Sequence, residues 1–474
     1  MVFSSLSFLF VFLPLLLLVY FCPLCAGRGA KNGVLLIFSL AFYSCGGWRL
    51  MPIILISILL NYTLGRRVAP GRGERGRKQA LILAVAGNLG ILLLFKYMNF
   101  LTYNLQLLVP ALPVTDIVLP IGISFYTFQS LSYVIDVYRG QALPEKSLLR
   151  VALYIVFFPQ LIAGPIVRYT TIETELRQRR ETLEEAAQGG VRFLYGLAKK
   201  VLLSNAMGQI ADAAFSQKPD ALSCGLAWLG VAAYTAQIYF DFSGYSDMAI
   251  GLGRIFGFHF PENFKYPYIS QSVTEFWRRW HISLSTWFRD YLYIPLGGNR
   301  CSLGRQIVNL LIVWTLTGFW HGAQWTFLLW GAWYALLLIG ERYLWGDAFQ
   351  RLPRPLRHGI TLLLVMLGWL LFRAEGLTQV GQFAAAMAGQ AAGGLWSGQV
   401  TYLLLQFRWE LILAVLCALP VKLWLQTALE ARKDRPLSRL ALGWGVPILA
   451  LGLGVLSVMQ LIGTGFNPFI YFQF

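Results

Sequence analysis

The chain has 474 residues, of which 57% are hydrophobic and 13% are charged, whereas soluble globular domains average about 25% charged residues. This composition excludes an ordinary soluble domain and predicts a polytopic α-helical membrane protein. The formal net charge of +17 would indicate a nucleic-acid ligand in a soluble protein. Here the basic residues gather in short loops between apolar stretches, which is typical of the cytoplasmic loops of membrane proteins.

The apolar stretches recur along the whole chain, and many approach the roughly 20 residues that span a bilayer. They comprise Leu6–Cys25, Leu50–Leu64, Ile117–Ile135, Leu222–Phe240, Gln306–Trp320, Trp325–Ile339, Ile360–Phe372, Leu411–Leu425 and Leu442–Ile462. We expect a single membrane-embedded domain over residues 1–474, with roughly ten to twelve transmembrane and re-entrant helices. The basic loop 66–78, RRVAPGRGERGRK, is predicted to be cytoplasmic.

Two polar segments interrupt the apolar pattern. Residues 170–200 include ETELRQRRETLEEA in helical register, which predicts an amphipathic helix on the cytoplasmic surface. Residues 258–305 mix aromatic with charged residues and are too polar to span the bilayer. Because Trp and Tyr favour the membrane interface, and irregular backbone at membrane depth needs protein or water beside it, we expect an interfacial or re-entrant segment that lines a funnel.

Prolines interrupt the apolar stretches in two further places. Pro120 lies in LPIGISFYTF, and Pro159 and Pro165 lie in FFPQLIAGPIVRY. Broken helices in membranes often surround a site rather than face lipid. These prolines therefore favour a cavity inside the helix bundle.

The usual catalytic motifs of soluble enzymes are absent from the sequence. It contains no Walker A loop, no H-E-x-x-H and no G-x-S-x-G nucleophile elbow. Cys22 and Cys25 form an isolated C-x-x-C, so we predict no metal site. The G-x-G-x-x-G at residues 71–76 follows a membrane helix rather than a strand, so it predicts no nucleotide site. The chain offers no obvious nucleophile of its own.

His321 is the strongest catalytic candidate among the four histidines. It follows the apolar run NLLIVWTLTGFW, and an ionisable residue at membrane depth is a functional hypothesis by default. Gly318 and Gly322 are predicted to leave open space beside the ring. Desolvation keeps an imidazole neutral, which suits a general base; the alternative is a neutral ring hydrogen-bonded inside the bundle. His259 and His358 are interpreted as structural and surface residues.

His281 lies in WRRWHISLSTWFRD, among arginines and tryptophans. The arginines could hold the phosphates of a nucleotide-bearing donor, because planar guanidinium groups suit phosphate. Alternatively, they belong to a basic juxtamembrane helix that contacts anionic lipid. The candidate donor-binding residues are Arg278, Arg279, Arg289 and Trp280. Asp241 and Asp247, in YFDFSGYSD, either pair with these arginines or order the site.

Several long strings resemble the membrane-bound O-acyltransferase (MBOAT) family, in its alginate O-acetyltransferase-type branch. They are QIYFDFSGYSDMAIGLGRIFGF (237–258), PYISQSVTEFWRRWHISLSTWFRDYLYIPLGGNR (267–300) and GFWHGAQWTFLLWG (318–331). Residues 119–140 and 157–169, the N-terminal MVFSSLSFLF and the C-terminal PFIYFQF fit the same branch. Relatives that acetylate cellulose or other exopolysaccharides share these strings, so the acceptor polymer stays open.

The resemblance implies an all-α fold in which a ring of helices surrounds a central funnel or tunnel. It also implies a multi-pass protein of the bacterial inner membrane that moves an acetyl group from a cytoplasmic thioester donor, acetyl-CoA or another acyl thioester, across the membrane. The family's two site histidines carry over to His321 and His281. No bound cofactor is implied.

The resemblance further implies a periplasmic partner of the SGNH-hydrolase type, whose serine passes the acetyl group to an exopolysaccharide of the alginate or cellulose type. Three alternatives remain open at this point. The chain could transfer D-alanyl groups to a cell-wall polymer, as a related member does. It could be a transporter or export channel for a polysaccharide or lipid-linked sugar, or a scaffold for a secretion complex.

Overall fold

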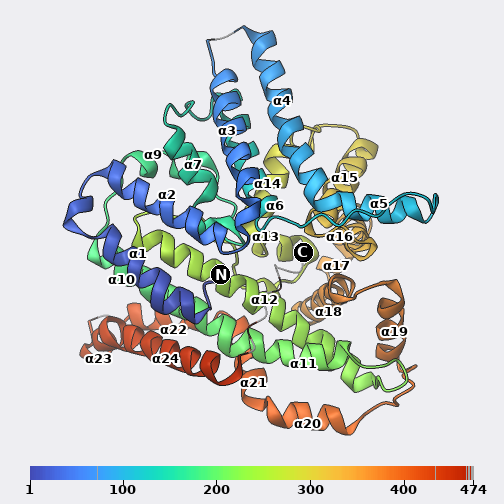
Figure 1. The fold of residues 1–474 in the computed structure, drawn as a ribbon. Coiled ribbons are helices and arrows are strands. Elements are labelled where there is room, and N and C mark those ends of the chain that lie inside the picture. Colours follow the sequence, from blue (N-terminus) through green and yellow to red (C-terminus); the bar gives the residue numbers. More distant parts are fainter. Residues whose placement is uncertain (72, 433, 466, 468–469, 471–474) are drawn as a thin grey trace. The chain divides into compact units, whose positions relative to one another are not determined.

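The computed structural model describes residues 1–71, 73–432, 434–465, 467 and 470. Helices make up the fold in this part of the chain, which contains no strand (Figure 1). The all-α prediction is therefore confirmed. Arg72 of the basic loop 66–78 and all of the C-terminal string 468–474 except Ile470 lie outside the described residues.

The chain forms two compact units. Unit 1 comprises residues 1–193 and 246–261, and unit 2 comprises residues 194–245 and 262–474. The long helix α12 (Cys224–Ile255) contributes residues to both units. The prediction of a single membrane-embedded acyltransferase domain, and of a ring of helices around a central funnel, stays a prediction.

Unit 1 is built mainly from the N-terminal helices. They are η1 (Phe8–Phe12), α1 (Leu13–Tyr20), η2 (Pro23–Cys25), α2 (Arg28–Ser44), η3 (Trp48–Leu50), α3 (Met51–Arg67), α4 (Glu74–Leu92), η4 (Leu93–Tyr97), α5 (Met98–Gln106), α6 (Ile123–Tyr138), α7 (Leu148–Val156), α8 (Phe158–Leu161), α9 (Tyr169–Arg177) and most of α10 (Leu183–Ala198).

Unit 2 contains the remaining helices. They are η5 (Lys199–Ser204), α11 (Asn205–Phe215), η6 (Pro267–Ile269), α13 (Val273–Arg279), α14 (Ile282–Phe288), η7 (Arg289–Tyr293), α15 (Leu303–His321), α16 (Trp325–Tyr343), α17 (Gly346–Gln350), α18 (Arg354–Arg373), α19 (Leu377–Met387), α20 (Gly398–Gln406), α21 (Arg408–Ala418), α22 (Val421–Glu430), α23 (Pro436–Leu440), η8 (Ala441–Gly445) and α24 (Val446–Thr464).

Four helical stretches in the described part are long and apolar enough to cross a membrane: Trp48–Arg67, Glu74–Gln106, Arg354–Arg373 and Pro436–Thr464. The pair α20 and α21, bent by 67°, would make a fifth. Long unbroken spans are thus fewer than the roughly ten to twelve spanning and re-entrant helices expected from hydropathy, because several apolar stretches are broken. The protein is a polytopic helical membrane protein.

Two of the predicted spans show why the stretches break. In Ile117–Ile135 the helix α6 begins only at Ile123, after Gly122 in the left-handed conformation with φ 72°. A side chain at Gly122 would place its Cβ 2.5 Å from the Leu161 carbonyl oxygen, so glycine is required there. In Leu411–Leu425 the helix α21 stops at Ala418, and Pro420 precedes α22.

The segment 170–200 differs from the predicted single amphipathic helix. It forms α9 and α10, and residues 178–182 between them are not helical. The helical register of the sequence continues through this break, but Arg179 and Glu181 turn into unit 1 and make tertiary contacts there. Tertiary bonding overrides the local helical preference at these two residues.

The segment 258–305 consists of extended chain and short helices. Its predicted place at the membrane interface, lining a funnel, stays a prediction. Helix α13 begins where the Ser272 hydroxyl accepts a hydrogen bond from the Glu275 N–H at 3.0 Å, and Glu275 accepts one from the Gln271 N–H at 2.9 Å. The Glu341 carboxylate of α16 accepts from the Val273 N–H at 2.8 Å. These bonds satisfy the first N–H groups of α13 and fix where it starts.

Candidate active site

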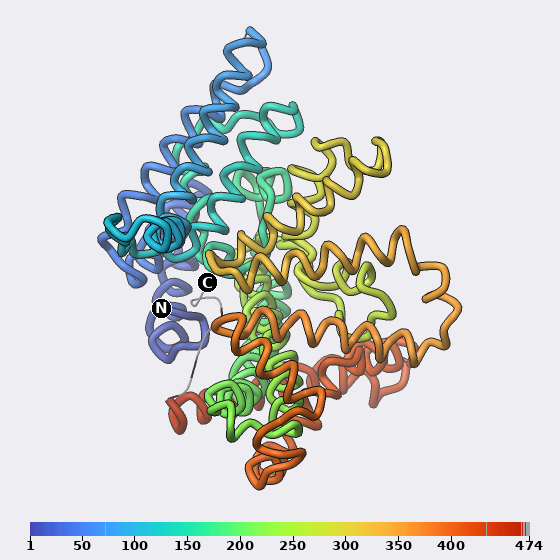
Figure 2. Tube along the Cα trace, turned by 90° about the vertical axis from the view of Figure 1, so that its right-hand side faces the viewer, coloured from blue at the N-terminus to red at the C-terminus, as the bar shows by residue number. Residues whose placement is uncertain are grey.

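His321 is the last residue of α15, just before the short link to α16. The two helices pack closely as antiparallel neighbours (Figure 2, yellow to orange). His321 is buried, and its ring lies among other aromatic rings: the centroid distances are 4.9 Å to Trp320, 5.1 Å to Trp330 and 5.2 Å to Phe372. The imidazole therefore lies in an apolar aromatic setting, as the sequence predicted.

The prediction of open space beside His321 is wrong. A Cβ at Gly318 would lie 2.2 Å from the Phe327 carbonyl oxygen, and a Cβ at Gly322 would lie 2.2 Å from the Phe327 ring. Gly331 approaches Trp314 in the same way, with a Cβ-to-carbonyl distance of 2.4 Å. These glycines let α16 approach α15 closely, because a side chain at any of them would collide with the neighbouring helix.

His281 lies between α13 and α14 and is completely buried, with 1% of its surface exposed. Its backbone adopts the left-handed conformation, φ 43° and ψ 53°, which is uncommon for a residue with a side chain. Strained backbone of this kind is often found at functional sites. The His281 Nδ1 lies 3.1 Å from Asn263 Oδ1.

The ring of His281 packs among aromatic side chains. Its centroid lies 4.6 Å from that of Phe242, in an edge-on arrangement, and 6.3 Å from that of Trp320. Burial lowers the pKa of His281 well below the usual range of an imidazole, so the ring is neutral at physiological pH. Trp320 thus contacts both predicted histidines, which are 40 residues apart in the sequence.

A group of aromatic side chains that the sequence analysis did not single out surrounds this centre. It contains Trp277, Trp314, Trp330 and Tyr334, with Trp277 4.8 Å from Tyr334 and Trp330 5.2 Å from Tyr334. The indole N–H groups of Trp277 and Trp330 and the hydroxyl of Tyr334 are buried and have no hydrogen-bond partner among the described residues. Trp330 and Tyr334 lie in the aromatic-rich string TGFWHGAQWTFLLWGAWY, whereas Trp277 and Trp314 lie outside it.

The predicted donor-binding residues separate into three kinds. Arg279 forms an ion pair with Glu275 at 2.8 Å, and Arg289 forms one with Asp290 at 2.7 Å. Arg278 is exposed, and no ion pair involves it in the described part of the chain. Trp280 is a core residue, buried to 3% exposure, with its ring 4.7 Å from that of Trp369.

The two predicted site-ordering aspartates do not pair with these arginines. Asp241 lies within 2.8 Å of Lys200 Nζ, and both side chains are almost completely buried. The Ile470 N–H donates to the other oxygen of Asp241 at 2.9 Å. Asp247 belongs to unit 1 and forms an ion pair with Arg192 at 2.8 Å. The expected pairing with the arginines of 277–289 is therefore wrong.

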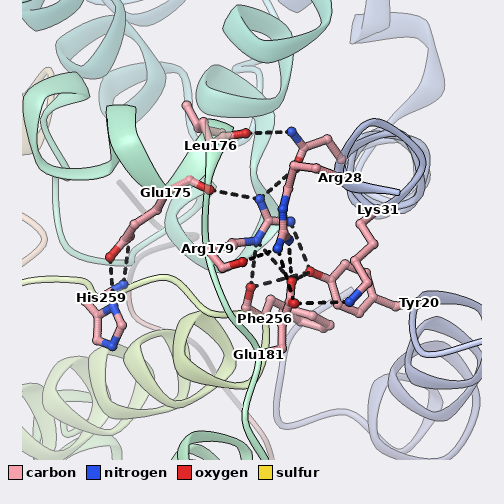
Figure 3. A network of polar contacts seen from close by, with 10 residues as sticks. Tyr20, Arg28, Lys31, Glu175, Leu176, Arg179, Glu181, Phe256 and His259 are labelled. Atoms are coloured by element: carbon pink, nitrogen blue, oxygen red, sulfur yellow. Dashed lines mark hydrogen bonds and ion pairs between the residues drawn. The ribbon is translucent and has the colours of Figure 1, made fainter. Parts of the chain in front are cut away.

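A second polar cluster lies within unit 1 and centres on Glu181 (Figure 3). The Glu181 carboxylate accepts hydrogen bonds from Arg28, from the Tyr20 hydroxyl at 2.6 Å and from Lys31 at 3.1 Å. Arg179 Nε lies 3.4 Å from the same carboxylate. We call these five residues the Glu181 cluster.

All three nitrogens of the Arg179 guanidinium donate hydrogen bonds. It donates to the Phe256 carbonyl at 2.9 Å, to the Asn32 side-chain oxygen at 2.7 Å and to the Tyr20 hydroxyl at 3.0 Å. Burial raises the pKa of Glu181, but the hydrogen bonds from Arg28, Tyr20 and Lys31 outweigh burial and lower the pKa to about 2. The cluster is thus a saturated network in which Arg179 is buried and Arg28 and Lys31 are half-buried.

His259 and His358 both have structural partners. His259 Nδ1 lies 2.7 Å from the Glu175 carboxylate, and its side chain is 54% exposed. His358 Nδ1 lies 3.2 Å from the Ser270 carbonyl oxygen. Among the described residues, no group of three or more His, Cys, Asp or Glu side chains could hold a metal ion. The two buried histidines beside Trp320 are therefore the strongest candidates for chemistry.

The chain matches the family of membrane-bound O-acyltransferases over residues 81–365, a range that includes both His281 and His321. It is 42% identical to the probable alginate O-acetylase AlgI of Azotobacter vinelandii, with 100% of both chains covered. It is 47% identical to the probable alginate O-acetylase AlgI of Pseudomonas aeruginosa, over 82% of this chain and 75% of that protein.

A peptidoglycan O-acetyltransferase of Helicobacter pylori is 34% identical over 82% of this chain and 80% of its own length. The chain therefore belongs to the membrane-bound O-acyltransferase family, in the branch that resembles the alginate O-acetylases, and it is an acyltransferase.

Proposed function

We propose that this acyltransferase moves an acetyl group from a cytoplasmic acyl thioester across the bacterial inner membrane for O-acetylation of an exopolysaccharide of the alginate type. The observation that carries the proposal is the pair of buried histidines, His281 and His321, packed against the same Trp320 ring. The similarity to alginate O-acetylases supports the choice of polymer.

His321 acts as the general base in this proposal. A neutral imidazole takes the proton from an acceptor hydroxyl as the hydroxyl oxygen attacks the carbonyl carbon of the acetyl thioester. The new C–O bond forms, the C–S bond breaks, and the thiol leaves with the proton that the imidazole returns. His281 helps to hold the acceptor in place by accepting a hydrogen bond from it at its Nε2 atom.

Arg278 is the residue best suited to hold an anionic donor. Arg279 and Arg289 already neutralise Glu275 and Asp290, whereas Arg278 is exposed at the end of α13. A planar guanidinium binds phosphate through two N–H groups, so acetyl-CoA fits as the donor. The juxtamembrane alternative, in which Arg278 contacts anionic lipid, predicts no effect on use of the donor.

The acceptor in this proposal is a serine of a periplasmic SGNH-type partner, which passes the acetyl group to the polymer. The motive is the lack of a G-x-S-x-G nucleophile elbow in this chain. Asp241 supports the site indirectly, because it precedes Phe242, whose ring packs on His281. Asp247 fixes a later turn of α12 through Arg192.

The test replaces His321 with alanine in cells that make the exopolysaccharide. We expect His321→Ala to lose about 10²- to 10⁴-fold in acetyl transfer, the usual contribution of a general base, while the protein accumulates in the membrane. His259→Ala is the matched control, because this histidine is half exposed and lies outside the site. Acetyl content near the wild-type level in His321→Ala would refute the role, and polymer that is acetylated but not exported would favour a transporter.

A further inference from the structure

We propose that Asn263 is a positioning residue that holds the proton of His281 on Nδ1 and leaves the lone pair on Nε2 for the reaction. The inference deepens the proposed function and rests on the role of His281 in it. It is carried by the hydrogen bonds around the Asn263 side chain, which fix the orientation of both residues.

The orientation of the Asn263 amide follows from Ser283. The Ser283 backbone N–H lies 3.2 Å from Asn263 Oδ1, and the Ser283 hydroxyl lies 2.8 Å from the same atom. A backbone N–H can only donate, so the atom that faces it is the amide oxygen and not the amide nitrogen. Turning the amide over would set two donors against each other.

The tautomer of His281 follows from that orientation. His281 Nδ1 lies 3.1 Å from the same Asn263 oxygen. An oxygen can only accept in this contact, so Nδ1 must carry the hydrogen. In a neutral imidazole the other nitrogen is then an acceptor. Nε2 is buried and has no hydrogen-bond partner among the described residues.

The backbone also holds the two residues together. The Ile282 N–H donates to the Asn263 carbonyl at 3.0 Å, and the Lys265 N–H donates to the Arg279 carbonyl at 2.9 Å. The extended chain at 263–265 therefore pairs with the turn that carries His281 in its left-handed conformation. Asn263 itself is buried to 1% exposure, so the bond to Nδ1 is shielded from competing water.

The side chains that pack against the His281 ring in the described part of the chain are aromatic. They are Phe242 of α12, Phe264 and Trp320 of α15, and none of these rings carries a charge. The titratable neighbour is His321, which shares the contact with Trp320. A neutral acceptor at Nδ1 keeps His281 neutral, whereas a carboxylate there would favour the protonated ring.

The experiment compares Asn263→Asp with Asn263→Leu in the full chain. Release of CoA thiol from acetyl-CoA is followed from pH 5 to pH 9 in membrane vesicles that contain the protein and its acceptor machinery. Asn263→Asp keeps an acceptor at Nδ1 but adds a negative charge, which favours the protonated ring. The rate should therefore fall at the acid end of this pH range, where the wild type, with its low His281 pKa, keeps its rate. Asn263→Leu removes the acceptor and should lower the maximal rate about 10- to 100-fold, part of the usual contribution of a general acid or base.

Asn309→Leu is the matched control, because Asn309 is a buried asparagine of α15 whose amide donates to the Leu296 carbonyl at 3.1 Å. It should change the amount of folded protein without moving the pH profile. A purely structural Asn263 would behave in the same way, so wild-type pH profiles in both Asn263 variants overturn the inference.

His281→Ala distinguishes failure of the positioning role of Asn263 from failure of the proposed function. If His281→Ala is inactive while Asn263→Leu has a normal rate and profile, the positioning role fails and the proposed function stands. If His281→Ala keeps the wild-type rate, His281 leaves the mechanism and the role of Asn263 falls with it. Should Asn263→Leu fail to accumulate, the fall in rate at acid pH in Asn263→Asp decides alone.

Discussion

The Glu181 cluster of unit 1 and the histidine site of unit 2 are both polar and largely buried, but they differ in how far their polar atoms are hydrogen-bonded. In the cluster, one carboxylate accepts from Arg28, Tyr20 and Lys31, and Arg179 donates to four oxygens. In the site, His281 Nε2 and the Trp330 N–H are buried without a partner among the described residues.

Under the proposed function, the difference separates a stabilising network from a reactive one. Fully satisfied buried networks fix one structure, whereas an unpaired buried polar atom costs about 1–3 kcal/mol. A fold retains such atoms where a substrate or ordered water pairs with them. We therefore expect changes in the Glu181 cluster to alter stability, and changes in the histidine site to alter the rate per folded molecule.

The largest stability effect is expected for Glu181→Gln. This change leaves Arg28, Lys31 and the buried Arg179 without their shared carboxylate, and breaking a buried ion pair from one side costs about 3–5 kcal/mol. Thermal unfolding in detergent should show a clear fall in Tm. Glu184→Gln is the control, since Glu184 is exposed and bonds only to Gln188 in the described structure. Equal Tm values for the two variants would show that the Glu181 cluster does not stabilise the fold in the way proposed.

A smaller effect is expected from acid, because acid protonates the same carboxylate without removing it. The pKa of Glu181 falls from the usual 4.5 to about 2 in the folded protein. The unfolded chain takes up the proton first as the pH falls, so the stabilisation is complete above about pH 4.5 and is lost towards pH 2. Tm measured across this range should fall less steeply in Glu181→Gln than in the wild type. Parallel curves would show that Glu181 does not contribute to the acid sensitivity.

The smallest effect is expected on the KM for the acetyl donor, and it tests which arginine of the site binds that donor. Arg278→Ala removes an exposed guanidinium with no ion pair in the described part, and loss of one charge-assisted hydrogen bond costs about 1.5–3 kcal/mol. The KM for acetyl-CoA should rise roughly ten- to a hundredfold. Arg289→Ala should leave this KM nearly unchanged, because Arg289 is paired with Asp290. Equal KM values in both variants would assign Arg278 to lipid contact instead.

The sequence predicts the fold class well because hydropathy over long windows depends on local composition alone. It also singles out His281 and His321 as candidates, because a titratable residue in an aromatic or apolar run can be seen in the sequence itself. Their common contact with Trp320 is not visible, because it depends on how α15 packs against the turn after α13. The same limit explains the error at Gly318, where the space is taken by the Phe327 carbonyl of the next helix.

The polar partners were the hardest feature to predict. Asp241 pairs with Lys200 rather than with an arginine. Lys200 lies in GLAKKVLL, where nothing in the sequence indicates that this lysine forms a buried ion pair. The break at residues 178–182 depends on partners as distant in sequence as Arg28 and Phe256. Periodicity reports the preference of a segment for helix, but not the distant groups that overcome it.

The central claim is tested most directly by the rate of acetyl transfer per folded molecule in His321→Ala and Glu181→Gln, measured side by side in vesicles from acetyl-CoA. Folded protein is counted by size-exclusion chromatography of each preparation. The account predicts a loss of about 10²- to 10⁴-fold for His321→Ala, the range of a general base, and a rate near the wild-type value for each folded Glu181→Gln molecule. A wild-type rate per folded His321→Ala molecule would contradict it.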